Sequence, residues 1–144
     1  MLARAFAIPF DEKRLILEAL ARIVWVRIEM SISAPSVVLS RRTRRASTAD
    51  ARHSPLQIGL SVERAAKLVP GTTCLPKALV VAGMLRSRGY DCELHLGVRE
   101  EAARVAAHAW VEVGREVILG SSCNISDFKK LPVISREQEH PHAG

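Results

Sequence analysis

Apolar residues follow a helical period up to about residue 90 of this chain and a strand period after it. In three segments they return every three or four positions, which predicts three helices: 11–30, 56–69 and 74–88. In three later segments they alternate with polar residues, which predicts strands: 92–98, 105–113 and 117–119. A short helix is expected at 126–130. The order of these elements predicts an α+β fold, in which helices pack on a small antiparallel sheet.

The first predicted helix is amphipathic. Its polar residues Arg14, Glu18 and Arg22 recur every fourth position, and apolar residues fill the faces between them: Leu15, Ile16, Ala19, Leu20, Ile23 and Trp25. We expect this apolar side to pack on the rest of the domain or on a partner protein. Charged residues interrupt every apolar run before it reaches the roughly 20 residues that a bilayer span needs. Membrane contact is therefore disfavoured.

The other two predicted helices carry recognisable start and stop signals. Ser61 is the expected N-cap of the second helix, which Pro70-Gly71 ends. Thr72 and Thr73 precede the third helix, Pro76 falls in its first turn, and Gly89 follows it as a C-cap residue would. Cys74 then lies at the positive end of the helix dipole, a setting that stabilises a thiolate.

Composition fits one domain with an N-terminal extension, since 144 residues with 48% hydrophobic and 25% charged content can bury a core. We divide the chain into an N-terminal helix and basic linker, residues 1–55, and a core, residues 56–144. Three cysteines without a CxxC pair argue against a disulfide framework or a zinc site, and no metal or cofactor is expected. Residues 1–10 make a poor secretion signal. A cytoplasmic protein is the resulting expectation.

The net charge of +6 arises largely from four arginines in the linker: Arg41, Arg42, Arg44 and Arg45. Such a run is usually a solvated loop, and no aromatic platform or nucleic-acid motif accompanies it, so nucleic-acid binding is not expected. The chain also lacks the Gly-x-x-x-x-Gly-Lys sequence of a phosphate-binding loop, and we place no ATP site on it.

Cys74 and His108 are the residues that can carry chemistry. Each alone has a structural explanation, because small cysteines are often buried and a histidine between alanines can belong to a core. A cysteine that opens a helix, followed by a hairpin and then a histidine on a strand, is the arrangement that thiol catalysis needs. Trp110 lies two residues beyond His108, on the same strand face. The joint pattern favours catalysis.

The sequence also resembles a known family in four motifs: Cys74-Leu75-Pro76-Lys77-Ala78-Leu79, Leu85-Arg86-Ser87-Arg88-Gly89-Tyr90, Leu96-Gly97-Val98-Arg99 and Ala107-His108-Ala109-Trp110-Val111-Glu112-Val113. Together they look like the leader peptidases of lasso-peptide biosynthesis, within the transglutaminase-like, papain-related cysteine protease superfamily. The resemblance implies a cytoplasmic protease that removes the leader from a ribosomally made precursor. It also implies two partners, a small leader-recognition protein and an ATP-dependent macrocyclase.

Carried over by resemblance, Cys74 matches the nucleophile and His108 the base, and we assign Thr73 and Trp110 to the substrate cleft. The family often places an aspartate near the position of Gly120, which has no side chain. Asn124 or Asp127, a backbone carbonyl or a water could hold the imidazole instead. Two other functions stay open: acyl transfer to an amine, and peptide binding by a scaffold that has lost catalysis.

Overall fold

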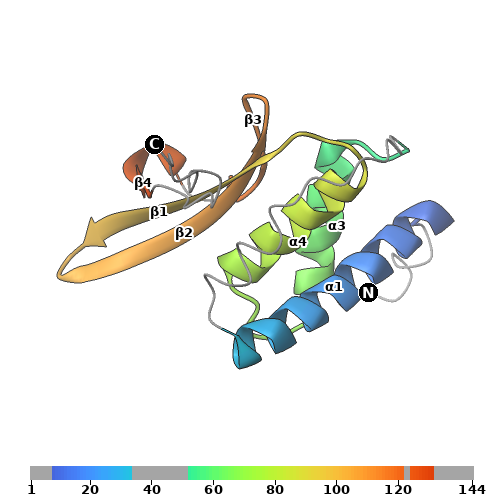
Figure 1. The fold of residues 1–144 in the computed structure, drawn as a ribbon, viewed down its shortest axis with the longest axis horizontal. Helices are drawn as coiled ribbons and strands as arrows, with labels where there is room; N and C mark the ends of the chain where they lie inside the picture. The colour runs from blue at the N-terminus through green and yellow to red at the C-terminus, as the bar shows by residue number, and fades with distance from the viewer. Residues whose placement is uncertain (1–7, 34–51, 122–123, 132–144) are drawn as a thin grey trace, which may run out of the picture.

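The computed structural model describes residues 8–33, 52–121 and 124–131, and it has the α+β architecture predicted from sequence (Figure 1). Its helices are α1 (Phe10–Ile32), α3 (Pro55–Ala66) and α4 (Cys74–Ser87). Its strands are β1 (Glu93–Glu101), β2 (Arg104–Val113), β3 (Glu116–Leu119) and β4 (Lys129–Lys130), and a 3-10 turn, η2 (Ile125–Asp127), precedes β4. No described helix is both long enough and apolar enough to cross a bilayer.

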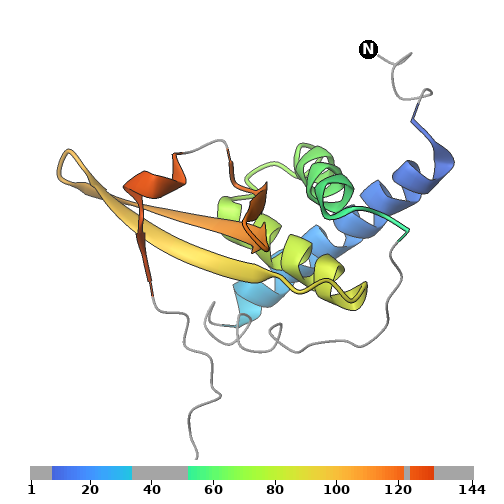
Figure 2. The ribbon, with the colours of Figure 1, turned by 90° about the horizontal axis from the view of Figure 1, so that it is seen from above.

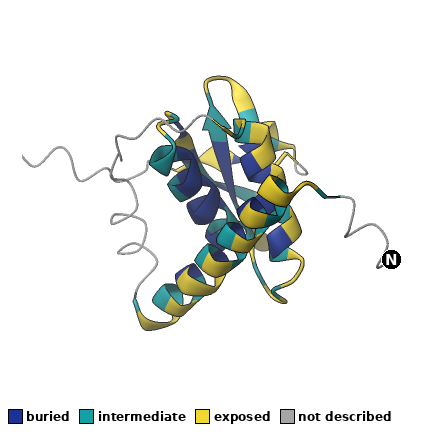
Figure 3. Ribbon diagram, turned by 90° about the vertical axis from the view of Figure 1, so that its right-hand side faces the viewer, coloured by how far each residue is buried: buried dark blue, intermediate teal, exposed yellow. Residues whose placement is uncertain are grey.

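Helix α1 buries one stripe and exposes the opposite side (Figure 3). Its buried residues Leu15, Ala19, Ile23 and Val26 are spaced by three or four positions and join the core formed with α3 and α4. Trp25 was expected on this apolar side, and that prediction is wrong, because its side chain is 60% exposed. Two residues turn a helix by about 200°, so Trp25 points away from the face that holds Ile23.

Helix α3 starts earlier than the sequence pattern suggested. Ser54 is its N-cap: the Ser54 hydroxyl accepts from the Gln57 backbone N–H, and the Gln57 side chain accepts from the Ser54 backbone N–H. Pro55 follows at the first helical position, where its missing N–H costs nothing. Ser61, the expected N-cap, is instead buried in mid-helix and donates its hydroxyl to the Gln57 carbonyl oxygen at 2.8 Å.

The sheet is antiparallel throughout, with strand order β3-β2-β1-β4. The long β1–β2 hairpin extends beyond the helices, and the segment with η2 and β4 crosses it there (Figure 2). Residues 126–130 were expected to form a short helix. That prediction is wrong for Lys129 and Lys130, which pair with Val98 and Gly97 of β1. Their strand conformation depends on a partner about thirty positions away, which local propensity does not reveal.

Helix α4 is the centre of the fold, with α1 and α3 packed on it and β2 behind it. Eight of its side chains are buried, among them Leu79, Met84 and Leu85. On β2, Ala109 and Val111 belong to the core shared with these helices. Because side chains alternate along a strand, His108 and Trp110 project from the other face of the sheet.

Candidate active site

Cys74 is the first residue of α4, as the sequence predicted. It is a half-buried free thiol that packs at the edge of the core. Thr73 precedes it as the N-cap residue in an extended conformation, and the Thr73 side chain makes no capping hydrogen bond. The first backbone N–H groups of a helix have no intrahelical acceptor. The start of α4 can therefore donate hydrogen bonds to an anionic oxygen that forms beside the sulfur.

His108 lies on β2 and is held by a backbone group. Its Nε2 is 3.1 Å from the carbonyl oxygen of Gly120, which follows β3. A carbonyl oxygen only accepts hydrogen bonds, so Nε2 must be the donor in this contact. The neutral imidazole then carries its proton on Nε2 and its lone pair on Nδ1. This tautomer leaves Nδ1 free to act as a base.

Two aromatic side chains flank the imidazole. The Trp110 ring is stacked near it, with ring centroids 6.1 Å apart and planes 20° apart, and the Phe128 ring lies 5.4 Å away at a tilt. Trp110 is fully buried and Phe128 nearly so. Across the strand pair, His108 faces Gly97, and a Cβ atom there would come within 2.9 Å of both the Trp110 ring and Phe128 Cβ. A glycine at position 97 thus makes room for the rings that position His108.

Gly120 leaves no room for the acidic residue that the family resemblance would place nearby. Its φ is +95°, which strains any residue with a side chain. A Cβ atom would lie 2.7 Å from Trp110 Cβ and 3.1 Å from His108 Nε2. The acceptor at this position is therefore the main chain, one of the alternatives that the sequence had left open.

Asn124 and Asp127, the side chains considered for the third catalytic position, have other partners. Asn124 Oδ1 accepts from the Ser126 hydroxyl at 2.8 Å. Asp127 Oδ2 lies 3.7 Å from Arg99 Nη1, and both candidate residues are exposed. The structure gives neither of them a hydrogen bond to His108, whose partner is Gly120.

Cys74 and His108 lie on adjacent elements, because α4 packs on β2. The packed face of β2 is the one that carries Ala109 and Val111, whereas His108 projects from the opposite face, so the structure does not show the two side chains in contact. Among the residues that the structure describes, no hydrogen bond joins the Cys74 thiol to the imidazole. Catalytic hydrogen bonds are often long in enzymes without substrate and tighten when substrate binds. Helix α4 and strand β2 are adjacent, and a contact between the Cys74 thiol and the His108 imidazole is a prediction.

Cys92 lies in a structural environment just before β1, although the sequence pattern had placed it on the strand itself. It is 7% exposed, and its thiol lies 3.8 Å from the Ala82 carbonyl oxygen. Burial raises the pKa of Cys92, although the charge of Arg86 works in the opposite direction. Cys92 is therefore a poor nucleophile. Cys123 lies outside the described residues.

Sequence reasoning left one part of this region open and missed two others. The Gly120 carbonyl has no sequence signature, and Phe128 reaches His108 only because the chain crosses back over the hairpin. The alternation of His95 with the apolar residues of segment 92–98 predicts an exposed side chain, yet the His95 side chain is 16% exposed and lies between Glu93 and Glu112. The alternation along β1 placed His95 on the correct face of the strand. It could not show which residues of β2 cover that face.

One family model, described as the transglutaminase-like superfamily, matches residues 15–133 of the chain. The match includes α3, α4, all four strands, Cys74 and His108. Neither the curated proteins nor the solved structures contain a match to this chain.

Proposed function

Because the chain belongs to the transglutaminase-like superfamily, we propose that it is a cysteine endopeptidase that removes the leader from a ribosomally made lasso-peptide precursor. The observation that carries the proposal is the hydrogen bond from His108 Nε2 to the Gly120 carbonyl oxygen. It fixes the tautomer that a thiol protease needs, on a strand that packs against the helix opened by Cys74. The four sequence motifs support the narrower assignment to lasso-peptide leaders.

The proposed reaction begins with substrate bound at the start of α4. His108 Nδ1 takes the thiol proton, and Cys74 Sγ attacks the carbonyl carbon of the leader–core amide. The oxyanion that forms accepts hydrogen bonds from the backbone N–H groups at the start of α4. His108 then gives its proton to the departing amine, which leaves a thioester between Cys74 and the leader. Water hydrolyses this thioester with His108 as base, which releases the leader carboxylate and restores the thiol.

Gly120 acts in this scheme through its carbonyl oxygen alone. The oxygen holds His108 in one orientation and stabilises the imidazolium that forms during each proton transfer. A carbonyl group is neutral and stabilises a cation less than a carboxylate does. The active unit is therefore a Cys74–His108 dyad supported by the main chain.

Two partners complete the proposed pathway: a small leader-recognition protein that delivers the precursor, and an ATP-dependent macrocyclase that takes the released core. The peptidase acts between them in the cytoplasm. Thr73, which lies beside Cys74, forms part of the proposed substrate cleft. Trp110 was assigned to the cleft as well, but its side chain is fully buried beside His108, so its proposed role is to support the imidazole.

A cleavage assay with mass spectrometry tests the proposal. The full chain is incubated with a synthetic precursor peptide, with and without the leader-recognition protein from the same gene neighbourhood. We expect a leader with a free carboxylate and a core with a free amine, and loss of both products in Cys74→Ala. Hydrolysis that persists in Cys74→Ala overturns the nucleophile assignment.

The same assay separates the competing functions. With hydroxylamine or a labelled amine present, an acyltransferase gives a modified leader carboxyl end even at low amine concentration, whereas a peptidase gives mainly the free acid. A scaffold without catalysis binds the leader and yields neither product. Either result replaces the endopeptidase proposal.

A further inference from the structure

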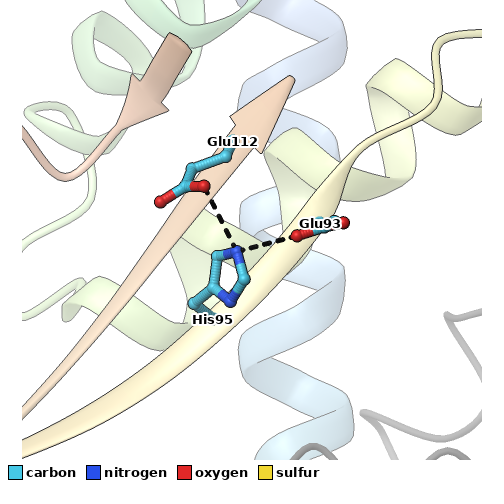
Figure 4. A group of neighbouring side chains, drawn as sticks. All are labelled: Glu93, His95 and Glu112. Carbon is cyan, nitrogen blue, oxygen red and sulfur yellow. Dashed lines mark ion pairs between the residues drawn. The ribbon is translucent and has the colours of Figure 1, made fainter. Parts of the chain in front are cut away.

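A second group of side chains with chemical potential lies on the same hairpin as Trp110. The β1–β2 register places Glu93 directly opposite Glu112, and His95 opposite Trp110 (Figure 4). Two carboxylates in a direct cross-strand pair repel each other. The pair is stabilised only if positive charge lies between or beside them.

His95 faces both carboxylates without forming a hydrogen bond to either. Its Nε2 lies 3.2 Å from Glu93 Oε2 and 3.5 Å from Glu112 Oε2, with one carboxylate on each side of the ring nitrogen (Figure 4). The Nε2 atom is buried and has no hydrogen-bond partner, so neither oxygen lies in the direction that a ring N–H requires. A buried nitrogen left in this state costs stability unless another group satisfies it.

The distances match those between ligands that share one metal ion. Zinc binds imidazole nitrogen and carboxylate oxygen at about 2.0–2.2 Å, so neighbouring ligand atoms of a tetrahedral site lie about 3.3–3.6 Å apart. The two His95 separations, 3.2 and 3.5 Å, are close to this range. All three ligand atoms lie within 4.8 Å of one another, and the exposed Glu93 side chain can move to bring the two carboxylate oxygens closer when an ion binds. The ring nitrogen and both oxygens are thus close enough to bind one ion between the strands.

We propose that Glu93, His95 and Glu112 form a binding site for a divalent transition-metal ion of the Zn²⁺ class, with water as the fourth ligand. One imidazole and two carboxylates suit borderline d-block ions better than Mg²⁺ or Ca²⁺, which prefer oxygen ligands throughout. The Glu93 side chain is 76% exposed, so an ion and its water can reach the site from solvent. The cysteine count alone had argued against a zinc site, and this one uses no cysteine.

Two residues beside the site affect metal binding: Trp110 orients the Glu112 carboxylate, and Lys130 competes with the ion for it. Trp110 Nε1 donates to Glu112 Oε1 at 2.9 Å, which orients that carboxylate and leaves Oε2 for the ion. Lys130 Nζ lies 3.9 Å from the same Oε1 and is the cation that competes with a bound metal. The Lys130 side chain is 53% exposed and can move into solvent when the ion binds.

Metal binding here is connected to His108 through Trp110. The Trp110 indole is bonded to Glu112 at one end and stacks near the His108 imidazole. An ion between β1 and β2 would therefore stabilise the hairpin that carries the imidazole. The site itself does not depend on the proposed protease function, because it shares no residue with the Cys74–His108 dyad.

The test is metal binding to the full chain in a background that removes competing ligands. In the parent variant, Cys74→Ala, Cys123→Ala, His140→Gln and His142→Gln remove thiols and tail imidazoles that could bind zinc elsewhere. Titration calorimetry with ZnCl₂ should give one equivalent bound, and Zn²⁺ should raise the melting temperature. Co²⁺ should give the visible absorption bands of a tetrahedral site.

Variants of the ligands and a matched control decide the outcome. His95→Gln and Glu112→Gln should each weaken Zn²⁺ binding by about tenfold or more, since loss of supporting groups alone costs about 10–100-fold. Glu116→Gln, an exposed carboxylate on β3, should leave binding unchanged, and Lys130→Gln should strengthen it. Thermal melts without metal show that each variant folds.

Three results overturn the proposal. The first is Zn²⁺ binding that His95→Gln does not weaken. The second is equal affinity for Mg²⁺ and Zn²⁺, which would show that the imidazole nitrogen takes no part. The third is absence of Zn²⁺ binding in a folded parent variant, which leaves the cluster as an ion pair only.

Discussion

His108 and Gly120 are joined by a 3.1 Å hydrogen bond from the imidazole Nε2 to a main-chain carbonyl oxygen. Because the acceptor for His108 is a backbone oxygen, no side-chain mutation can remove it directly. Side-chain substitutions nearby should leave the acceptor in place, whereas changes at Gly120 itself move the backbone that holds the oxygen.

Gly120→Ala should destabilise the fold and slow cleavage, because it combines a positive φ with a Cβ atom 2.7 Å from Trp110 Cβ. Gly114→Ala is the matched control: its φ is +62°, and a Cβ atom added there would meet nothing within 4 Å. The strain of φ alone costs about 1–2 kcal/mol at either glycine. Denaturant unfolding should show a larger loss for Gly120→Ala. Equal losses at the two positions would contradict the crowding seen around Gly120.

Asn124→Ala and Asp127→Ala should leave the cleavage rate close to that of the wild type. Neither side chain is hydrogen-bonded to His108, so their removal leaves the Gly120 acceptor intact. Loss of an orienting side chain would lower the rate constant by about 100- to 10,000-fold. Single-turnover cleavage of a synthetic precursor measures this, and a drop of that size in either variant would return that side chain to the catalytic unit.

Cys74 should react with a thiol-directed reagent well before Cys92. Cys74 is partly exposed at the start of α4, whereas Cys92 is 7% exposed and burial raises its pKa. Iodoacetamide labelling at neutral pH, followed by peptide mass spectrometry, gives the two rates. Denatured protein is the control, since both cysteines should then react at similar rates. Faster labelling of Cys92 in the folded protein would be incompatible with its position in the core.

The turn between β1 and β2 should be open to stabilisation. Ala102 and Ala103 both have positive φ, 41° and 68°, as in the type I′ hairpin turn that favours Asn-Gly. The double variant Ala102→Asn/Ala103→Gly should raise the free energy of unfolding by about 1–3 kcal/mol. Ala107→Gly, in the exposed middle of β2, should instead lower it by about 0.5–1 kcal/mol. A destabilised Asn-Gly variant would show that the turn has another conformation.

Stability should depend on Glu18 in acid. Burial alone raises the pKa of this carboxyl, but its hydrogen bond to Arg88 and the charges of Arg88 and Arg22 outweigh that effect, so the pKa lies below its ordinary value. A depressed pKa stabilises the fold above the unfolded-state value, and this contribution is lost as the pH falls through the folded-state value. Wild type should therefore exceed Glu18→Gln in stability at pH 7, and the gap should shrink below about pH 4.

Arg88→Gln tests the origin of that gap. Arg88 Nη2 lies 2.7 Å from Glu18 Oε2, and the Arg88 side chain is 14% exposed. In the Arg88→Gln protein, Glu18→Gln should lower the free energy of unfolding by less than it does in the wild type. Urea unfolding at several pH values measures this difference. A gap of unchanged size would assign the pH dependence to other carboxyl groups.

The sequence predicted the order and type of the main elements because their apolar periods are local properties. The helix at Cys74 and the strand at His108 were therefore found at the right places. Trp25 was misplaced because an apolar residue between two buried positions was taken as part of the buried stripe. Ser61 was taken as an N-cap, although Ser54-Pro55-Leu56-Gln57 is the better signal by the capping-box rule.

The parts that sequence could not give depend on long-range pairing. Lys129 and Lys130 become a strand only where β1 offers its free edge. The Gly120 carbonyl reaches His108 because β3 returns beside β2, and any residue would supply the same carbonyl group. Likewise, Glu93 meets Glu112 only through the register of the hairpin. Side-chain patterns identify which residues can react, and the register decides which of them meet.

The two tryptophans differ so strongly in burial that their fluorescence can be told apart. Trp110 is fully buried beside His108, and Trp25 is 60% exposed on the outer side of α1. Iodide in solution should quench the fluorescence of Trp25 and spare that of Trp110. A Trp25→Phe protein would then emit from the indole beside the imidazole alone, and its spectrum would follow events at that site without an added dye.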